Sequence, residues 1–81
     1  MIVVWQPPAR RDLRRLDPPI ARQVRDAVLR FAATGQGDVS RLRPPLEGYR
    51  LRSGDWRVRF RFDAPDLIHV EHVRHRSQAY R

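Results

Sequence analysis

Arginine is the residue type with which this sequence could do the most chemistry. Its seventeen basic residues are all arginines and outnumber nine acidic residues, which gives a formal net charge of +8. Guanidinium groups bind phosphate through two parallel hydrogen bonds. A net positive charge of this size also attracts nucleic acid, acidic lipid or acidic protein. From Trp56 to Phe62 arginine alternates with apolar residues, so a strand there would place Arg57, Arg59 and Arg61 on one face.

Three histidines near the end of the chain could transfer protons, because an unperturbed imidazole titrates near neutrality. His69, His72 and His75 have a helical spacing, but their neighbours favour a strand. In a regular strand His69 and His75 share one face and His72 lies on the other, so the sequence predicts no metal site. The alternative interpretation is hydrogen-bonded sheet histidines. There is no glycine-rich phosphate loop, Ser-His-Asp pattern or carboxylate pair, and we expect no cofactor.

The remaining residues predict the elements that must position these groups. Prolines, glycines and apolar periodicity indicate two helices joined by a two-proline turn, with Asp17 as the N-cap of the second. A polar connector over 36–47 follows, with Leu42 and Leu46 as its anchors, and period-two patterns then indicate strands. The expected elements are a strand at 2–5, helices at 8–16 and 18–34, and strands at 49–52, 56–62 and 67–73.

This order, β-α-α-β-β-β, predicts an α+β fold in a single domain over 1–81, with an antiparallel helix hairpin covering one face of a mainly antiparallel sheet. The apolar side of 56–62 must face the helices, so its arginines face away. If the strands pair as hairpins, Arg50 and Arg52 join them. Five guanidinium groups on one small face repel one another, which favours an anion-binding surface. The alternative is a solvated face paired with nearby carboxylates, namely Glu47, Asp55, Asp63 and Glu71.

Composition narrows the class of protein further. The chain has no cysteine and no apolar run near the roughly 20 residues that span a bilayer. Met1–Trp5 is too short, and lacks the charged region, for a signal peptide. Hydrophobic residues make up 41% of the chain, which is too many for a disordered basic tail. We therefore expect a folded, cytoplasmic protein with no membrane partner.

Three segments together resemble the RelE/ParE toxins of bacterial type II toxin–antitoxin systems. They are YRLRSGDWRV at 49–58, HVRHR at 72–76 with a closing Tyr80, and LRRL at 13–16. The resemblance covers nearly the whole chain and implies a RelE-like fold. It also implies a cognate antitoxin that neutralises the toxin, and the positive charge leads us to expect that an acidic or amphipathic segment of it binds here.

The family has two toxic activities. RelE-like members cut mRNA in the ribosomal A site, and ParE-like members poison DNA gyrase without hydrolysing anything. The tail from Arg74 to Tyr80 looks more like the first kind, a metal-independent endoribonuclease that cleaves mRNA on the ribosome through 2′-OH attack and so inhibits translation. The alternatives are a ParE-like gyrase inhibitor, a catalytically impaired RelE homologue, and a basic nucleic-acid-binding domain without toxicity.

The resemblance also implies roles for particular residues. Arg57 and Arg74 match the phosphate-binding arginines of the family, and Tyr80 matches its terminal tyrosine. With His75 they form the expected catalytic set. The arginines expected to bind RNA are Arg50, Arg52, Arg59, Arg61 and Arg76.

This sequence departs from the family pattern in having no lysine. Arg50 stands where members often carry a catalytic lysine, and Gly48 stands where a second one can occur. Arginine stabilises negative charge well but is a very poor base. Proton transfer would therefore fall to Tyr80, His75 or His72.

Overall fold

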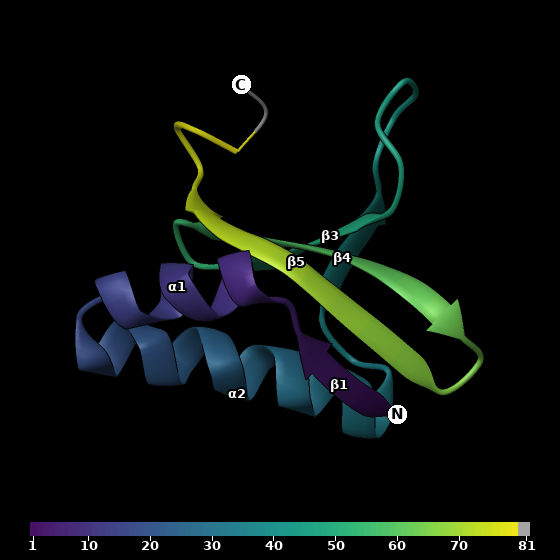
Figure 1. The fold of residues 1–81 in the computed structure, drawn as a ribbon, viewed down its shortest axis with the longest axis horizontal. Coiled ribbons are helices and arrows are strands. Elements are labelled where there is room, and N and C mark those ends of the chain that lie inside the picture. The colour runs from purple at the N-terminus through teal and green to yellow at the C-terminus, as the bar shows by residue number, and fades with distance from the viewer. Residues whose placement is uncertain (80–81) are drawn as a thin grey trace.

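The computed structural model describes residues 1–79, which form two helices and a five-stranded mixed sheet (Figure 1). The sheet order is β1-β5-β4-β3-β2, in which β1 pairs with β5 in parallel and every other pair is antiparallel. The expected α+β architecture is confirmed. In chain order the elements are β1 (Ile2–Trp5), α1 (Pro7–Arg15), α2 (Pro18–Thr34), β2 (Asp38–Arg41), β3 (Tyr49–Ser53), β4 (Trp56–Ala64) and β5 (Leu67–His75).

Strand β2 lies inside the segment predicted to be a connector, and that prediction is wrong. Its sequence, DVSR, offers a single apolar side chain, Val39, so neither an alternating nor a continuous apolar pattern is present. It forms because its backbone pairs with β3, with Val39 opposite Leu51. Of the two expected anchors, Leu42 is buried, whereas Leu46 is 38% exposed.

Both helices begin at paired prolines, whose fixed φ suits the first turn and whose missing N–H needs no partner there. Asp17 occupies the N-cap position of α2 but makes no side-chain hydrogen bond to the helix. With prolines at the first two positions, only the third N–H remains for such a cap. The helix ends at Gly35, which has φ 75° and donates its N–H to the carbonyl of Phe31.

The helices form an antiparallel hairpin against one face of the sheet, as predicted (Figure 1). The core between them joins Val24 and Val28 of α2 to Leu51, Val58 and Phe60 of the sheet, all at most 3% exposed. The apolar side of β4 therefore faces the helices, and its last member, Phe62, lies near Phe31 of α2 and Tyr49 but is 40% exposed. Neither helix of the described chain is long and apolar enough to cross a bilayer.

At its far end, the edge of β5 that faces away from β4 is held by a helix instead of a strand. Strand β1 pairs with β5 only as far as Val70. Beyond that point Asp12 of α1 accepts a hydrogen bond from the backbone N–H of Val73 at 2.8 Å. This contact occupies an edge donor that would otherwise lack a partner and fixes the segment of β5 that carries His72 and Arg74.

Candidate functional site

The sheet face opposite the helices carries the five arginines predicted to share it: Arg50, Arg52, Arg57, Arg59 and Arg61, here called the arginine face. In the register of β3 and β4, Arg50 lies opposite Arg59 and Arg52 lies opposite Arg57. The row formed by Arg52 and Arg57 continues onto β5, where Arg74 lies opposite Arg57. Like charges directly opposite one another on a sheet are destabilising, so this arrangement favours a bound anion.

A β-bulge at Glu71 decides which histidines reach this face. His72 pairs with Arg59 and Val70 pairs with Phe60, so Glu71 is an extra residue of β5 with no partner opposite. His69, on one side of the bulge, and His72, on the other, therefore both lie on the arginine face. This corrects the prediction from a regular strand, in which they lie on opposite faces.

His75 lies on the other side of the sheet. It pairs with Trp56, and the two rings meet edge to face with centroids 5.3 Å apart. Its Nδ1 atom is 2.9 Å from the hydroxyl of Ser77. His75 is thus separated by the sheet from Arg57 and Arg74, with which the sequence analysis grouped it.

Four residues on neighbouring strands form a square that we call the β4–β5 cluster: Arg57 and Arg59 on β4, His72 and Arg74 on β5. Arg57 Nη1 donates to the carbonyls of Gly54 and Trp56, at 2.8 and 3.0 Å. Within residues 1–79, no carboxylate lies at ion-pair distance from Arg57 or Arg74. These two side chains therefore present positive charge that no carboxylate of the described chain neutralises.

Arg59 is more strongly held by its surroundings. Its Nη2 donates to the carbonyl of Glu47 at 3.1 Å, and its Nε lies 3.7 Å from a carboxylate oxygen of Glu71. That separation is an ion pair without a hydrogen bond, and Nε is buried with no hydrogen-bond partner in the described chain. Arg59 thus brings to the β4–β5 cluster a buried donor that no acceptor of the described chain uses.

The surroundings of His72 shift its pKa clearly from the usual value. Burial, and then the positive charges of Arg74 and Arg59, lower the pKa of His72 below 6.5, against weaker opposing effects of Asp12 and Glu71. Its Nδ1 is buried without a hydrogen-bond partner. The side chain lines a cleft of about 420 Å³ with Gln6, Pro8, Asp12, Glu71 and Arg74. A neutral imidazole beside two arginines can accept a proton near pH 7.

Arg61 and Arg52, elsewhere on the arginine face, each lie near a carboxylate. Asp63 bridges Arg61 and His69 through its two oxygens, at 3.4 and 3.1 Å, and Gln6 contacts the other ring nitrogen of His69. Arg52 lies 4.0 Å from Asp38. Exposed ion pairs of this kind contribute about 0–1 kcal/mol to stability, so an anion that binds the arginine more strongly can replace the carboxylate.

One other residue chosen from the sequence stands apart from the cluster. Arg76 follows β5 and lies 3.7 Å from Asp55 in the β3–β4 turn. Tyr80 lies outside the described residues. The alternation of β4 identified Arg57 and Arg59, but the grouping of His72 with them depends on the bulge, which leaves no clear pattern in the sequence.

Comparison with known proteins agrees with this fold. The family model of the ParE toxin of type II toxin–antitoxin systems, parDE, matches residues 3–80. A chain in the crystal structure of the RelBE2 toxin–antitoxin complex from Mycobacterium tuberculosis is 30% identical, with 90% of this chain and 94% of that chain covered and a TM-score of 0.68.

A chain in the RelB–RelE antitoxin–toxin complex from Methanococcus jannaschii matches in fold, with a TM-score of 0.75 at 17% identity. That match covers 95% of this chain and 94% of the other. No curated protein sequence matches with significance.

Proposed function

This chain belongs to the RelE/ParE family of toxins from type II toxin–antitoxin systems, and we propose that it is a metal-independent endoribonuclease that cleaves mRNA on the ribosome and so inhibits translation. As a type II toxin it has a cognate antitoxin, in keeping with the toxin–antitoxin complexes it resembles. We assign cleavage to the β4–β5 cluster and RNA binding to the arginine face around it.

The observation that carries this proposal is the pair formed by Arg57 and Arg74. The two guanidinium groups come from directly opposite positions on β4 and β5, and no carboxylate of the described chain neutralises them. A scissile phosphate placed between them would relieve their repulsion. As the 2′-oxygen attacks phosphorus, the phosphoryl oxygens gain negative charge, which the two arginines would stabilise.

His72 is the base that this surface supports best. Its lowered pKa keeps the imidazole neutral near pH 7, and it lies two residues from Arg74 on the same face. In the proposed step a ring nitrogen takes the proton of the 2′-OH, the 2′-oxygen bonds to phosphorus, and the bond from phosphorus to the 5′-oxygen breaks. The product end is a 2′,3′-cyclic phosphate. The proton for the departing 5′-oxygen is assigned to Tyr80 on the family resemblance alone.

The test is to express the toxin with Arg57→Ala and Arg74→Ala combined, beside the wild type and Arg22→Ala. Arg22 is exposed on α2, so this control removes charge from the helix side. Primer extension on transcripts, with and without ribosomes, should show new mRNA ends for the wild type and the control. The rate of mRNA cleavage by the double variant should fall by a factor of about 10²–10³ for each arginine removed. Undiminished cleavage by a folded double variant would overturn the site assignment.

A second candidate function, inhibition of DNA gyrase, is favoured by one finding, the ParE description of the matching family model. The same expression experiment separates the two functions. A DNA-damage response with no new mRNA ends would overturn the ribonuclease proposal in favour of gyrase. Cut transcripts without a DNA-damage response would overturn the gyrase alternative.

A further inference from the structure

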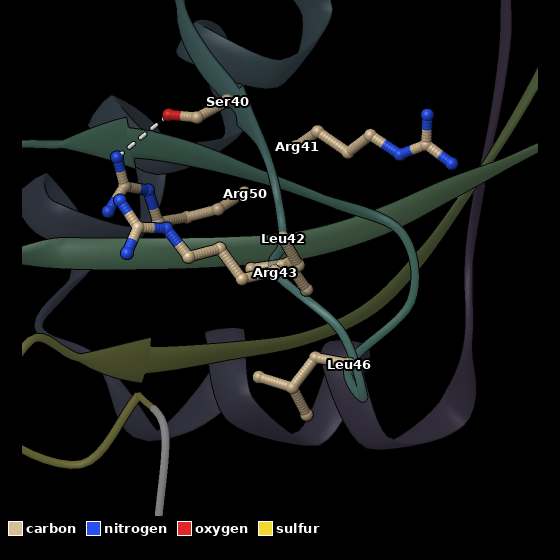
Figure 2. Close-up of a pocket in the computed structure, with 6 residues that line it drawn as sticks. All are labelled: Ser40, Arg41, Leu42, Arg43, Leu46 and Arg50. Atoms are coloured by element: carbon tan, nitrogen blue, oxygen red, sulfur yellow. Dashed lines mark hydrogen bonds between the residues drawn. The ribbon is translucent and has the colours of Figure 1, made fainter.

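A cleft of about 540 Å³ opens beyond the arginine face, where β2 ends and the loop to β3 begins (Figure 2). The loop rises from the sheet on the side away from the helices (Figure 1). We call this the loop cleft. The residues that line it are Ser40, Arg41, Leu42, Arg43, Leu46 and Arg50.

Two arginines point the same way along this cleft. Figure 2 shows the side chains of Arg43 and Arg50 extending on the side of Ser40, while Arg41 extends in the opposite direction. Arg50 Nη2 donates to the hydroxyl of Ser40 at 2.9 Å, and Arg50 Nε is buried without a hydrogen-bond partner. No ion pair within residues 1–79 involves any of the three arginines. The guanidinium groups of the cleft thus form no ion pair with a carboxylate of the described chain.

The cleft also has an apolar wall. Leu42 is buried at its base, and Leu46, at 38% exposure, leaves part of its side chain open to solvent. The apolar surface of one partly exposed leucine beside arginines is enough to contact a single sugar or base. An amphipathic peptide helix would need a longer apolar stripe.

The loop cleft adjoins the strand positions of the proposed cleavage site. Arg50 is both a wall of the cleft and the residue opposite Arg59 of the β4–β5 cluster. Because neighbouring strands lie about 4.8 Å apart, β3 and β5 are separated by roughly 10 Å. An RNA strand of a few nucleotides that crosses the sheet could therefore occupy both places.

From these observations we propose that the loop cleft is a subsite for single-stranded RNA, separate from the point of cleavage. Arg43 and Arg50 hold a phosphate, and Leu46 contacts the neighbouring sugar or base. This inference rests on the proposed function, because it takes RNA as the ligand of the adjoining arginine face. The subsite holds a neighbouring nucleotide of the RNA at a point beyond the β4–β5 cluster.

The test uses the full-length toxin and a fluorescent oligonucleotide of about eight nucleotides, 2′-O-methylated so that it cannot be cut. Fluorescence anisotropy gives its affinity over a series of salt concentrations. Arg43→Ala should weaken binding roughly tenfold and reduce the slope of log affinity against log salt by about 0.7, as expected for one lost phosphate contact. Arg22→Ala, the matched control on α2, should change affinity less than Arg43→Ala.

Arg43 is exposed, and the described chain gives its side chain no hydrogen bond, so its removal should not unfold the protein. Arg50→Ala should also weaken binding, with its thermal midpoint checked because the hydrogen bond to Ser40 is lost. If Arg43→Ala binds RNA no worse than Arg22→Ala, the subsite does not exist. If Arg43→Ala loses affinity for a poly-glutamate probe but not for the oligonucleotide, the cleft is an acidic-peptide site and the proposal is overturned.

Failure of this inference can be told from failure of the proposed function. The cleavage assay depends on Arg57 and Arg74, whereas the binding assay uses an RNA that cannot be cut. A toxin that never cleaves mRNA could still show the Arg43 effect on binding. A toxin that cleaves normally could still lack the effect.

Discussion

At the scale of single residues, His72 shows how the site affects stability. Burial and the positive charges of its neighbours Arg74 and Arg59 lower the pKa of His72, and Arg74 is one of the two arginines proposed to hold the scissile phosphate. The charged form of His72 is therefore disfavoured in the folded protein. The same arrangement that keeps His72 neutral for catalysis makes the fold sensitive to acid.

The sign of this effect gives a prediction. The pKa of His72 is lower in the folded chain than in the unfolded chain. As the pH falls below about 6.5, His72 therefore takes up a proton more readily in the unfolded chain than in the folded one. Stability due to neutral His72 should therefore be present at about pH 7.5 and decline toward about pH 5. Urea unfolding at the two pH values should show a smaller decline for His72→Asn than for the wild type. An equal decline in His72→Asn would show that other groups cause the acid sensitivity.

At the scale of elements, the sequence predicted some features of the site well and others poorly, for identifiable reasons. The alternation from Trp56 to Phe62 is local, so it reveals the two faces of β4 without knowledge of its neighbours. The pairing of Arg57 with Arg74 depends on the register between strands, which no single segment encodes. The bulge at Glu71 reverses the alternation of β5 between His69 and His72. Strand β2 was missed because backbone pairing, and not an apolar pattern, forms it.

In the loop between β2 and β3, Gly48 stands where the family resemblance leads us to expect that a lysine can occur, and the backbone there favours glycine. Gly48 has φ +95°, which side chains rarely adopt, and a Cβ added there would lie 2.7 Å from the carbonyl oxygen of Phe60. Gly48 also accepts the N–H of Leu42 at 2.9 Å, which closes the loop at its base. Since backbone cannot move aside cheaply, this geometry leaves no space for a lysine at position 48.

Gly48→Ala should therefore destabilise the protein by about 1–3 kcal/mol, and Gly48→Lys should not supply a working base. The matched control is Gly54→Ala, because Gly54 also has a positive φ, +58°, but a Cβ there meets no atom within 4 Å. Its cost should be only the conformational one, about 1 kcal/mol. Urea unfolding gives both values. Equal losses in the two variants would mean that the Phe60 carbonyl moves aside without cost.

At the scale of the whole molecule, the charge does not by itself select a face. Seven of the seventeen basic residues lie on the helices, opposite the arginine face. They are Arg10, Arg11, Arg14, Arg15, Arg22, Arg25 and Arg30. The net charge of +8 therefore attracts a polyanion to any side of the molecule. What distinguishes the sheet side is local: arginines that lie directly opposite one another on neighbouring strands, such as Arg57 and Arg74, and clefts beside them.

This division between general attraction and local contact leads to a prediction for the cognate antitoxin. If an acidic segment of the antitoxin binds this basic domain, attraction should speed association, and salt should screen it. Stopped-flow measurements from about 50 mM to about 500 mM salt should show the association rate falling at least tenfold, with a smaller change in the dissociation rate. Arg22→Ala should slow association slightly, because it removes one positive charge from the domain. An association rate that did not change with salt would mean that burial of apolar surface, and not charge, brings the two chains together.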